Sequence, residues 1–184
     1  MKAANVSARK RLTLLYRDGD MALYSYTPTI CRPLYVHFEH MTLSRRVRLL
    51  LERLGRNSYV VLYLEVEGAL VGHCVVAPGG RRLGRSTEND IVLGPYFIDP
   101  SHRGKGYAKI LVQWTLHKAG LTYKRAYDYI KKNNHASRKA TLACGFKQCG
   151  ELDIRGFFHN LVECPDGEYD IFSYDPTEVR IETD

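Results

Sequence analysis

The sequence predicts an α/β fold of the mixed α+β type, with a central, mostly antiparallel mixed sheet and flanking helices. Runs rich in Val, Leu and Tyr occur in pairs near both ends of the 184-residue chain, and a helical pattern separates two such runs in its middle. Hydrophobic residues make up 45% of the chain, which is enough for a core around one sheet. We therefore expect a single domain over residues 1–184, with flexible ends at residues 1–10 and 176–184.

In the first half of the chain we expect one or two short strands in residues 11–26, a helix in residues 42–54 and a hairpin in residues 58–77. The turn residues Asp18-Gly19-Asp20 divide the first pair of strands. The helix is predicted by apolar residues on one face with arginines off that face, and Gly55 stands where a C-terminal cap belongs. Glu67-Gly68 separates two apolar runs and predicts a tight hairpin turn.

In the second half we expect strands at residues 91–98, 125–130, 146–154 and 168–174, and helices from residue 107 and at residues 137–144. The first helix is expected to share one face among Tyr107, Ile110, Leu111, Trp114 and the stem of Lys118. Pro95 follows Gly94 inside the first of these strands and cannot donate a ladder hydrogen bond. Two readings stay open: a bulge or local splay at Gly94-Pro95, or a strand that begins only at Tyr96.

Composition limits the possible partners and location. Twenty-seven Lys and Arg against twenty Asp and Glu give a net charge of +7, which favours anionic partners such as nucleotides, nucleic acid or an acidic membrane face. The five cysteines are scattered and form no CxxC pair, so neither a disulfide framework nor a metal site is expected. No apolar run approaches the roughly 20 residues of a membrane span, and no signal peptide is evident. We expect a cytoplasmic monomer or homodimer with no membrane partner.

A Gly-rich basic loop lies between a strand and a helix at Arg103-Gly104-Lys105-Gly106-Tyr107-Ala108. This arrangement is typical of phosphate binding, because glycines allow close backbone approach and the helix N-terminus favours negative charge. Its spacing differs from the phosphate loop of nucleoside triphosphatases and from the dinucleotide fingerprint.

The segment from Ile98 to Ala108 resembles the acetyl-CoA motif of the GCN5-related N-acetyltransferases (GNAT), Gln/Arg-x-x-Gly-x-Gly/Ala. Arg103, Gly106 and Ala108 occupy its three fixed positions. Downstream, Asn134-His135-Ala136-Ser137 followed by Gly145-Phe146 is similar to the Asn-x-x-Ser and Gly-Phe segment of that family. Together the two matches cover roughly residues 91–146.

The resemblance implies a GNAT-like acyl-CoA N-acyltransferase fold and an acetyl-CoA-dependent N-acetyltransferase. The acetyl group would pass from acetyl-CoA, a co-substrate, to a primary amine of an unidentified acceptor, expected to be a small molecule, by direct attack in a ternary complex. The implied cofactor-binding residues are the loop residues Arg103, Gly104, Lys105, Gly106, Tyr107 and Ala108, the strand residues Phe97 and Ile98, and Asn134 and Ser137. Ser137 is also expected to cap its helix.

The acid and base of the reaction are less well marked. Many members place a tyrosine seven residues after the matching asparagine as general acid, but Thr141 stands there, and its hydroxyl is a poor proton donor. Tyr129 is the substitute candidate for a catalytic residue. Members often carry a general base on the strand before the motif, where this chain offers only Glu88 and Asp90 just ahead of it. Proton transfer through water is the alternative.

Two other functions remain as alternatives. One is a non-catalytic CoA-binding protein, which the missing tyrosine suggests. The other is a nucleic-acid-binding module, suggested by the net charge of +7. Nucleic acid is not the expected partner, because the arginines of residues 45–56 and 81–85 lack interleaved aromatic residues.

Overall fold

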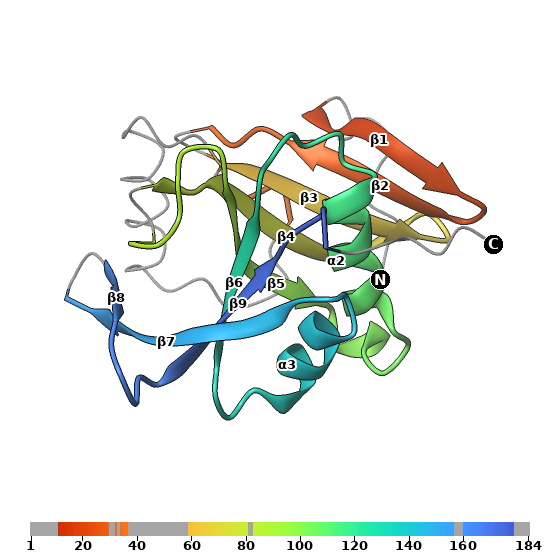
Figure 1. Ribbon diagram of the computed structural model, residues 1–184. Coiled ribbons are helices and arrows are strands. Elements are labelled where there is room, and N and C mark those ends of the chain that lie inside the picture. The colour runs from red at the N-terminus through yellow and green to blue at the C-terminus, as the bar shows by residue number, and fades with distance from the viewer. Residues whose placement is uncertain are drawn as a thin grey trace. The chain divides into compact units, whose positions relative to one another are not determined.

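The computed structural model describes residues 11–29, 32, 34–36, 59–80, 83–156 and 160–178 (Figure 1). The described residues form nine strands and two α-helices: β1 (Thr13–Asp18), β2 (Met21–Tyr26), β3 (Val60–Val66), β4 (Ala69–Pro78), β5 (Ile91–Ile98), α2 (Tyr107–His117), β6 (Ala126–Lys131), α3 (His135–Leu142), β7 (Lys147–Arg155), β8 (Asn160–Glu163) and β9 (Tyr169–Tyr174). The strand order is β1-β2-β3-β4-β5-β6-β9-β7-β8, and only β5 and β6 pair in parallel among the described strand pairs. This confirms the predicted mixed, mostly antiparallel fold class.

The chain divides into two compact units. Unit 1 contains Met1–Val76 and Pro95–Leu121, and unit 2 contains Ala77–Gly94 and Thr122–Asp184. The boundary therefore falls inside β5, between Gly94 and Pro95. The single domain expected over residues 1–184 stays a prediction.

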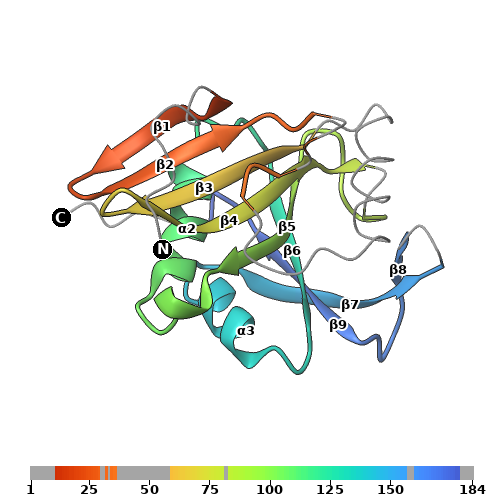
Figure 2. The same cartoon turned by 180° about the vertical axis from the view of Figure 1, so that it is seen from behind.

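Unit 1 is built on four antiparallel strands, β1 to β4 (Figure 2). One tight turn joins β1 to β2, and another joins β3 to β4. Glu67 and Gly68, at the predicted hairpin turn between β3 and β4, have φ values of 50° and 78°. Gly19, at the predicted break, has a φ of 53° and lies in the turn between the antiparallel strands β1 and β2. The predicted helix of residues 42–54 lies outside the described residues.

Helix α2 of unit 1 buries a different face from the one predicted. Its buried residues are Leu111, Val112, Thr115 and Leu116. Trp114 is only half-buried and meets the ring of Tyr16 edge to face, with 4.9 Å between centroids. The Lys118 ammonium lies 5.0 Å from the centre of the same ring, so the predicted face covers β1 rather than the core.

The core of unit 1 is rich in aromatic residues around Tyr63. Its hydroxyl accepts a hydrogen bond from the backbone N–H of Tyr35 at 2.8 Å, and burial raises its pKa to about 12. His73 is completely buried and stacks with Phe97, with ring centroids 6.3 Å apart. Strand β4 is thereby packed against the end of β5 from which the predicted cofactor loop leaves.

Unit 2 contains the antiparallel strands β6, β9, β7 and β8, with the first residues of β5 added in parallel to β6. The predicted pairing of the last two apolar runs is confirmed as β7 with β9, whereas β8 was not predicted. A buried cluster of Leu83, Val92, Tyr127, Leu152 and Ile171 forms the core on one face of these strands.

Strand β5 changes its alternation at Gly94-Pro95. At the start of β5, the N–H of Ile91 donates to the carbonyl of Arg125, the residue before β6, at 2.9 Å. The odd-numbered residues therefore face β6 there. At its end, the N–H of Asp99 donates to a carbonyl of β4 at 2.8 Å, so odd-numbered residues face β4. A regular strand keeps one alternation, so a bulge lies between these points. This change of alternation agrees with the predicted bulge or local splay, and the alternative start at Tyr96 is wrong, because β5 begins at Ile91.

We expect Gly72→Ala to destabilise the protein by about 1–3 kcal/mol, because the site is already filled. A Cβ on Gly72 would lie 2.5 Å from Cδ1 of Ile98 and 2.7 Å from the carbonyl oxygen of Phe97. Urea unfolding of Gly72→Ala, Ile98→Val and the double variant would measure this. Ile98→Val removes the clashing methyl, so the double variant should lose less stability than the sum of the single variants. Strict additivity would contradict this account.

Candidate functional site

The chain leaves β5 through a short capped turn in unit 1. The carboxylate of Asp99 accepts hydrogen bonds from the backbone N–H and the hydroxyl of Ser101, the former at 2.9 Å. The hydrogen bond from the Ser101 hydroxyl has the largest effect and the one from its backbone N–H the next largest. Together they hold the pKa of Asp99 below its usual range. Asp99 thereby caps the 3₁₀ turn Pro100–His102, and this turn directs the following residues into the Gly-rich loop.

The Gly-rich loop itself is open to solvent and depends on two glycines. Gly104 and Gly106 both have a φ of 78°, which is in the left-handed region, and a Cβ on either would meet no atom within 4 Å. Backbone conformation, and not crowding, therefore requires glycine at both positions. Gly106 is the N-cap of α2 and has no side chain to bond the first N–H groups, and the first turn carries no acidic residue. These N–H groups and the helix dipole favour an anion.

Arg103 is held against the strand that precedes the loop. Its Nε donates to the carbonyl of Ile98 at 3.1 Å, and its guanidinium carbon lies 4.9 Å from the centre of the Phe97 ring. The carbonyl of Phe97 lies beside Gly72 of β4, so the backbone groups of Phe97 face β4 and those of Ile98 face away from it. Of these two predicted residues, only Ile98 has its backbone groups on the side away from β4, and its carbonyl there accepts the hydrogen bond from Arg103.

In unit 2, Asn134 and Ser137 begin helix α3. Asn134 is the N-cap, because its side-chain oxygen accepts a hydrogen bond from the N–H of Ser137 at 3.2 Å. The expectation that Ser137 caps this helix is therefore wrong: Ser137 lies three residues after the cap and donates its backbone N–H to it. Asn134 is exposed and Ser137 is half-buried.

Thr141 forms a buried pair with Asp128 of β6. The resemblance described above would place a tyrosine at this position. The Thr141 hydroxyl donates to the Asp128 carboxylate at 2.9 Å, and the side chains are 0% and 3% exposed. Burial raises the pKa of Asp128 to about 7, although the Thr141 hydroxyl and the backbone N–H of Tyr129 oppose this shift. Sequence reasoning missed Asp128, because nothing in an apolar strand shows that α3 will cover its carboxylate.

Tyr129 follows Asp128 in β6 and therefore points to the opposite face of the sheet. Its half-buried ring packs on the core cluster of unit 2 and meets Tyr169 edge to face, with 6.3 Å between centroids. A catalytic role for Tyr129 stays a prediction.

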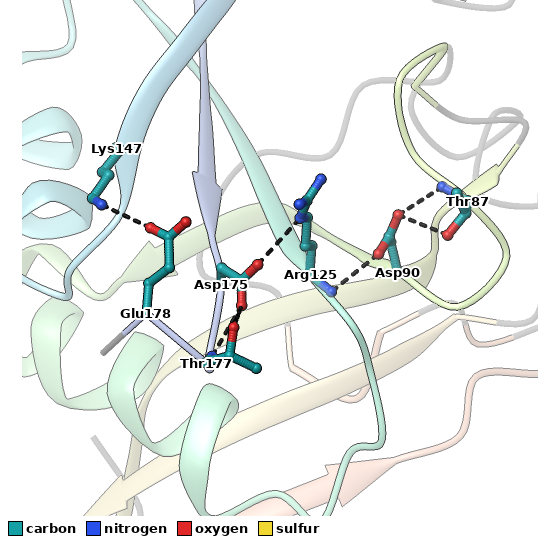
Figure 3. A network of polar contacts seen from close by, with 7 residues as sticks. All are labelled: Thr87, Asp90, Arg125, Lys147, Asp175, Thr177 and Glu178. Carbon is teal, nitrogen blue, oxygen red and sulfur yellow. Dashed lines mark hydrogen bonds and ion pairs between the residues drawn. The ribbon is translucent and has the colours of Figure 1, made fainter. Parts of the chain in front are cut away.

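The two candidate bases differ in their surroundings. Asp90 is buried, and its carboxylate accepts hydrogen bonds from the N–H and hydroxyl of Thr87 at 2.7 and 2.8 Å and from the N–H of Arg125 at 3.0 Å (Figure 3). Three donors occupy this carboxylate, so its role is to connect two segments of unit 2. Glu88 is exposed.

A model of the "Acetyltransferase (GNAT) family" matches residues 27–146 of this chain. The chain belongs to the GNAT acetyltransferase family. Within this GNAT chain, unit 1 holds Phe97, Ile98 and the loop residues 103–108, whereas unit 2 holds Asn134, Ser137 and Tyr129. A search of curated proteins finds no match.

Solved structures share the GNAT fold at low sequence identity. An uncharacterized protein from Bacillus halodurans has a TM-score of 0.65 at 13% identity, over 90% of this chain and 91% of its own. Spermidine N-acetyltransferase from Vibrio cholerae, solved with CoA and spermine, has a TM-score of 0.53 at 16% identity, over 76% and 80%. The protein yncA from Salmonella typhimurium, solved with acetyl-CoA, has a TM-score of 0.50 at 17% identity, over 85% and 94%.

In the described part of this GNAT chain, no group of three or more His, Cys, Asp or Glu side chains could hold a metal ion. None of its helices is long and apolar enough to span a bilayer.

The buried pair predicts how stability depends on pH. The folded-state pKa of Asp128 is about 7, above the unfolded value of about 3.9, so the folded protein binds the extra proton between these values. Stability from this group is complete below the lower value and is lost as pH rises through the upper one. Urea unfolding between about pH 5 and pH 8 should show a loss on the order of a few kcal/mol.

Asp128→Asn, which keeps the shape without the charge, should reduce this loss. Thr141→Val removes the donor that opposes the pKa shift and should enlarge it. If Asp128→Asn left the pH dependence unchanged, a different group would be responsible.

Proposed function

We propose that this protein is an N-acetyltransferase that transfers the acetyl group of acetyl-CoA to a primary amine of a small molecule. The observation that carries this proposal is the loop of residues 103–108, with its two left-handed glycines and the open N-terminus of α2. Family membership gives the loop its expected ligand, the pyrophosphate of CoA. The relatives solved with CoA and acetyl-CoA agree with this choice.

The loop provides three features that suit a pyrophosphate. The exposed backbone at Gly104 and Gly106 allows close approach, since no atom lies within 4 Å of either Cβ position. The N–H groups of the first turn of α2 supply donors. Lys105 is exposed and adds positive charge, whereas the Arg103 side chain is also engaged by Ile98 and the Phe97 ring. Backbone donors therefore do more of the binding than the side chains.

The reaction forms a bond between the amine nitrogen and the acetyl carbon, and it breaks the bond between that carbon and sulfur. The ammonium must first lose a proton to water or a base, and the departing CoA thiolate carries a negative charge. A thiolate with a pKa near ~8.5 can leave without full protonation. Because Thr141 is bonded to Asp128 in the interior, we propose that no side chain at this position donates a proton.

The first experiment measures thermal stability with acetyl-CoA and, separately, with CoA. A ligand at about a hundred times its dissociation constant should stabilise the protein by roughly 2.7 kcal/mol, without knowledge of the acceptor. Gly106→Val should abolish this stabilisation, because the loop loses its left-handed residue.

Gly120→Val is the matched control for this experiment. Gly120 also has a positive φ, 66°, and no atom within 4 Å of a Cβ, but it follows α2 and lies outside the loop. Both variants should lose about 1–2 kcal/mol of stability from backbone strain. Only Gly106→Val should lose the response to ligand. An equal loss of response in both would remove the support for this loop as the cofactor site.

A CoA-binding protein without catalysis is the second candidate, and the buried Thr141 favours it. A screen of primary amines for thiol release from acetyl-CoA separates the two functions. Release above the rate without acceptor supports the transferase. Stabilisation by CoA, with no thiol release from acetyl-CoA in the presence of any amine tested, supports the non-catalytic protein.

A further inference from the structure

Unit 2 contains a hollow of about 550 Å³ that no part of the proposed acetyl transfer uses. Its lining includes Arg85, Arg125, Tyr127, Lys147, Cys149 and Ser173. Its volume is in the usual range for sites that bind small molecules.

Small residues on the sheet create this hollow. Tyr127, Ser173 and Lys147 lie on one rung of the neighbouring strands β6, β9 and β7, and Ser173 is the small residue between two long ones. On β7 the register shifts between Gln148 and Gly150, so the strand bulges beside the hollow. Gly150 leaves space for the guanidinium of Arg85, which would lie 2.6 Å from a Cβ there.

Arg85 is fixed at one side of the hollow. Its Nε donates to the carboxylate of Glu163 at 2.9 Å, its backbone N–H donates to the same carboxylate at 3.1 Å, and its Nη1 donates to the carbonyl of Cys149. The side-chain hydrogen bond with Glu163 raises the pKa of Arg85 above its ordinary value. A charged donor is thus held in place before any ligand arrives.

Arg125 and Lys147 supply two further charges from the starts of β6 and β7 (Figure 3). The backbone N–H of Arg125 is anchored by Asp90 at 3.0 Å, and its Nε pairs with Asp175 at 3.3 Å. Lys147 pairs with Glu178 at 2.7 Å. The lining therefore carries three cations and two carboxylates.

The pairs of Arg125 and Lys147 are easily exchanged. The side chains of Arg125 and Lys147 are 51% and 75% exposed, and exposed ion pairs contribute little to stability. An incoming oxyanion can replace the carboxylate partners at small cost, and guanidinium groups bind carboxylates and phosphates with two parallel hydrogen bonds.

We propose that this hollow binds a small polar metabolite through an oxyanion, a carboxylate or a phosphate, held by Arg125 and Lys147 and by the prepositioned Arg85. Asp175 and Glu178 then accept hydrogen bonds from hydroxyl or ammonium groups of the same molecule. The site lies wholly in unit 2 and does not depend on the proposed acetyl transfer.

Calorimetric titration of the full chain with inorganic phosphate and with succinate tests the proposal, at constant ionic strength set with sodium chloride. We expect millimolar or tighter binding of at least one of them, and the difference identifies the oxyanion as phosphate or carboxylate. The double variant Arg125→Gln and Lys147→Gln should bind about tenfold more weakly or not at all. Because the loop of unit 1 is itself proposed to bind phosphate groups, the titrations are repeated in the background of Gly106→Val. Binding that remains in Gly106→Val and is lost on adding Arg125→Gln and Lys147→Gln belongs to the hollow.

Arg155→Gln is the matched control, because Arg155 of β7 also forms an exposed ion pair, with Asp153 at 3.0 Å, but does not line the hollow. Its binding should be unchanged. As a second readout, bound oxyanion should slow the alkylation of the exposed Cys149, measured by peptide mass. Absence of binding by both probes, or equal binding by the double variant with its melting temperature retained, would overturn the proposal.

Discussion

The architecture depends on the point in β5 where Pro95 follows Gly94. Proline has no N–H, so the ladder that joins β5 to β6 over Ile91–Leu93 cannot continue in the same register. The backbone is irregular at this point: the odd-numbered residues of β5 face β6 before it and β4 after it. One strand thereby belongs to both compact units, and its second half leads directly into the Gly-rich loop.

The loop and the hollow, the two places where we propose that anions bind, offer different kinds of hydrogen-bond donor. In the loop the donors are backbone N–H groups, so the determining residues are those that set the backbone: the Asp99 cap and the two left-handed glycines. In the hollow the donors are side-chain cations, whose positions are set by pairing, with Arg85 on Glu163 and Arg125 beside Asp175.

The pair of Asp128 and Thr141 changes how catalysis is to be considered in this member of the family. A position that often carries a proton donor is occupied by a structural contact between α3 and β6. Burial disfavours the charge of this carboxyl and raises its pKa to about 7, so a substantial share of it stays protonated at neutral pH. For the proposed acetyl transfer, proximity of amine and thioester with proton transfer through water is then the simplest route.

The sequence by itself determined the described strands other than β8, the hairpin turn at Glu67-Gly68, the break at Gly19, the interruption at Pro95 and the Gly-rich loop. Each depends on local backbone rules: positive φ at Gly19 and Gly68, and the missing N–H of Pro95. The sequence could not determine what depends on contacts between distant residues. Only the folded chain shows which face of α2 is buried and that Asn134, instead of Ser137, caps α3. The same holds for the burial of Asp128 beside Thr141 and for the ion pair of Arg85 with Glu163. Burial and ion pairing are properties of neighbours in space, and only the tertiary structure decides which residues those are.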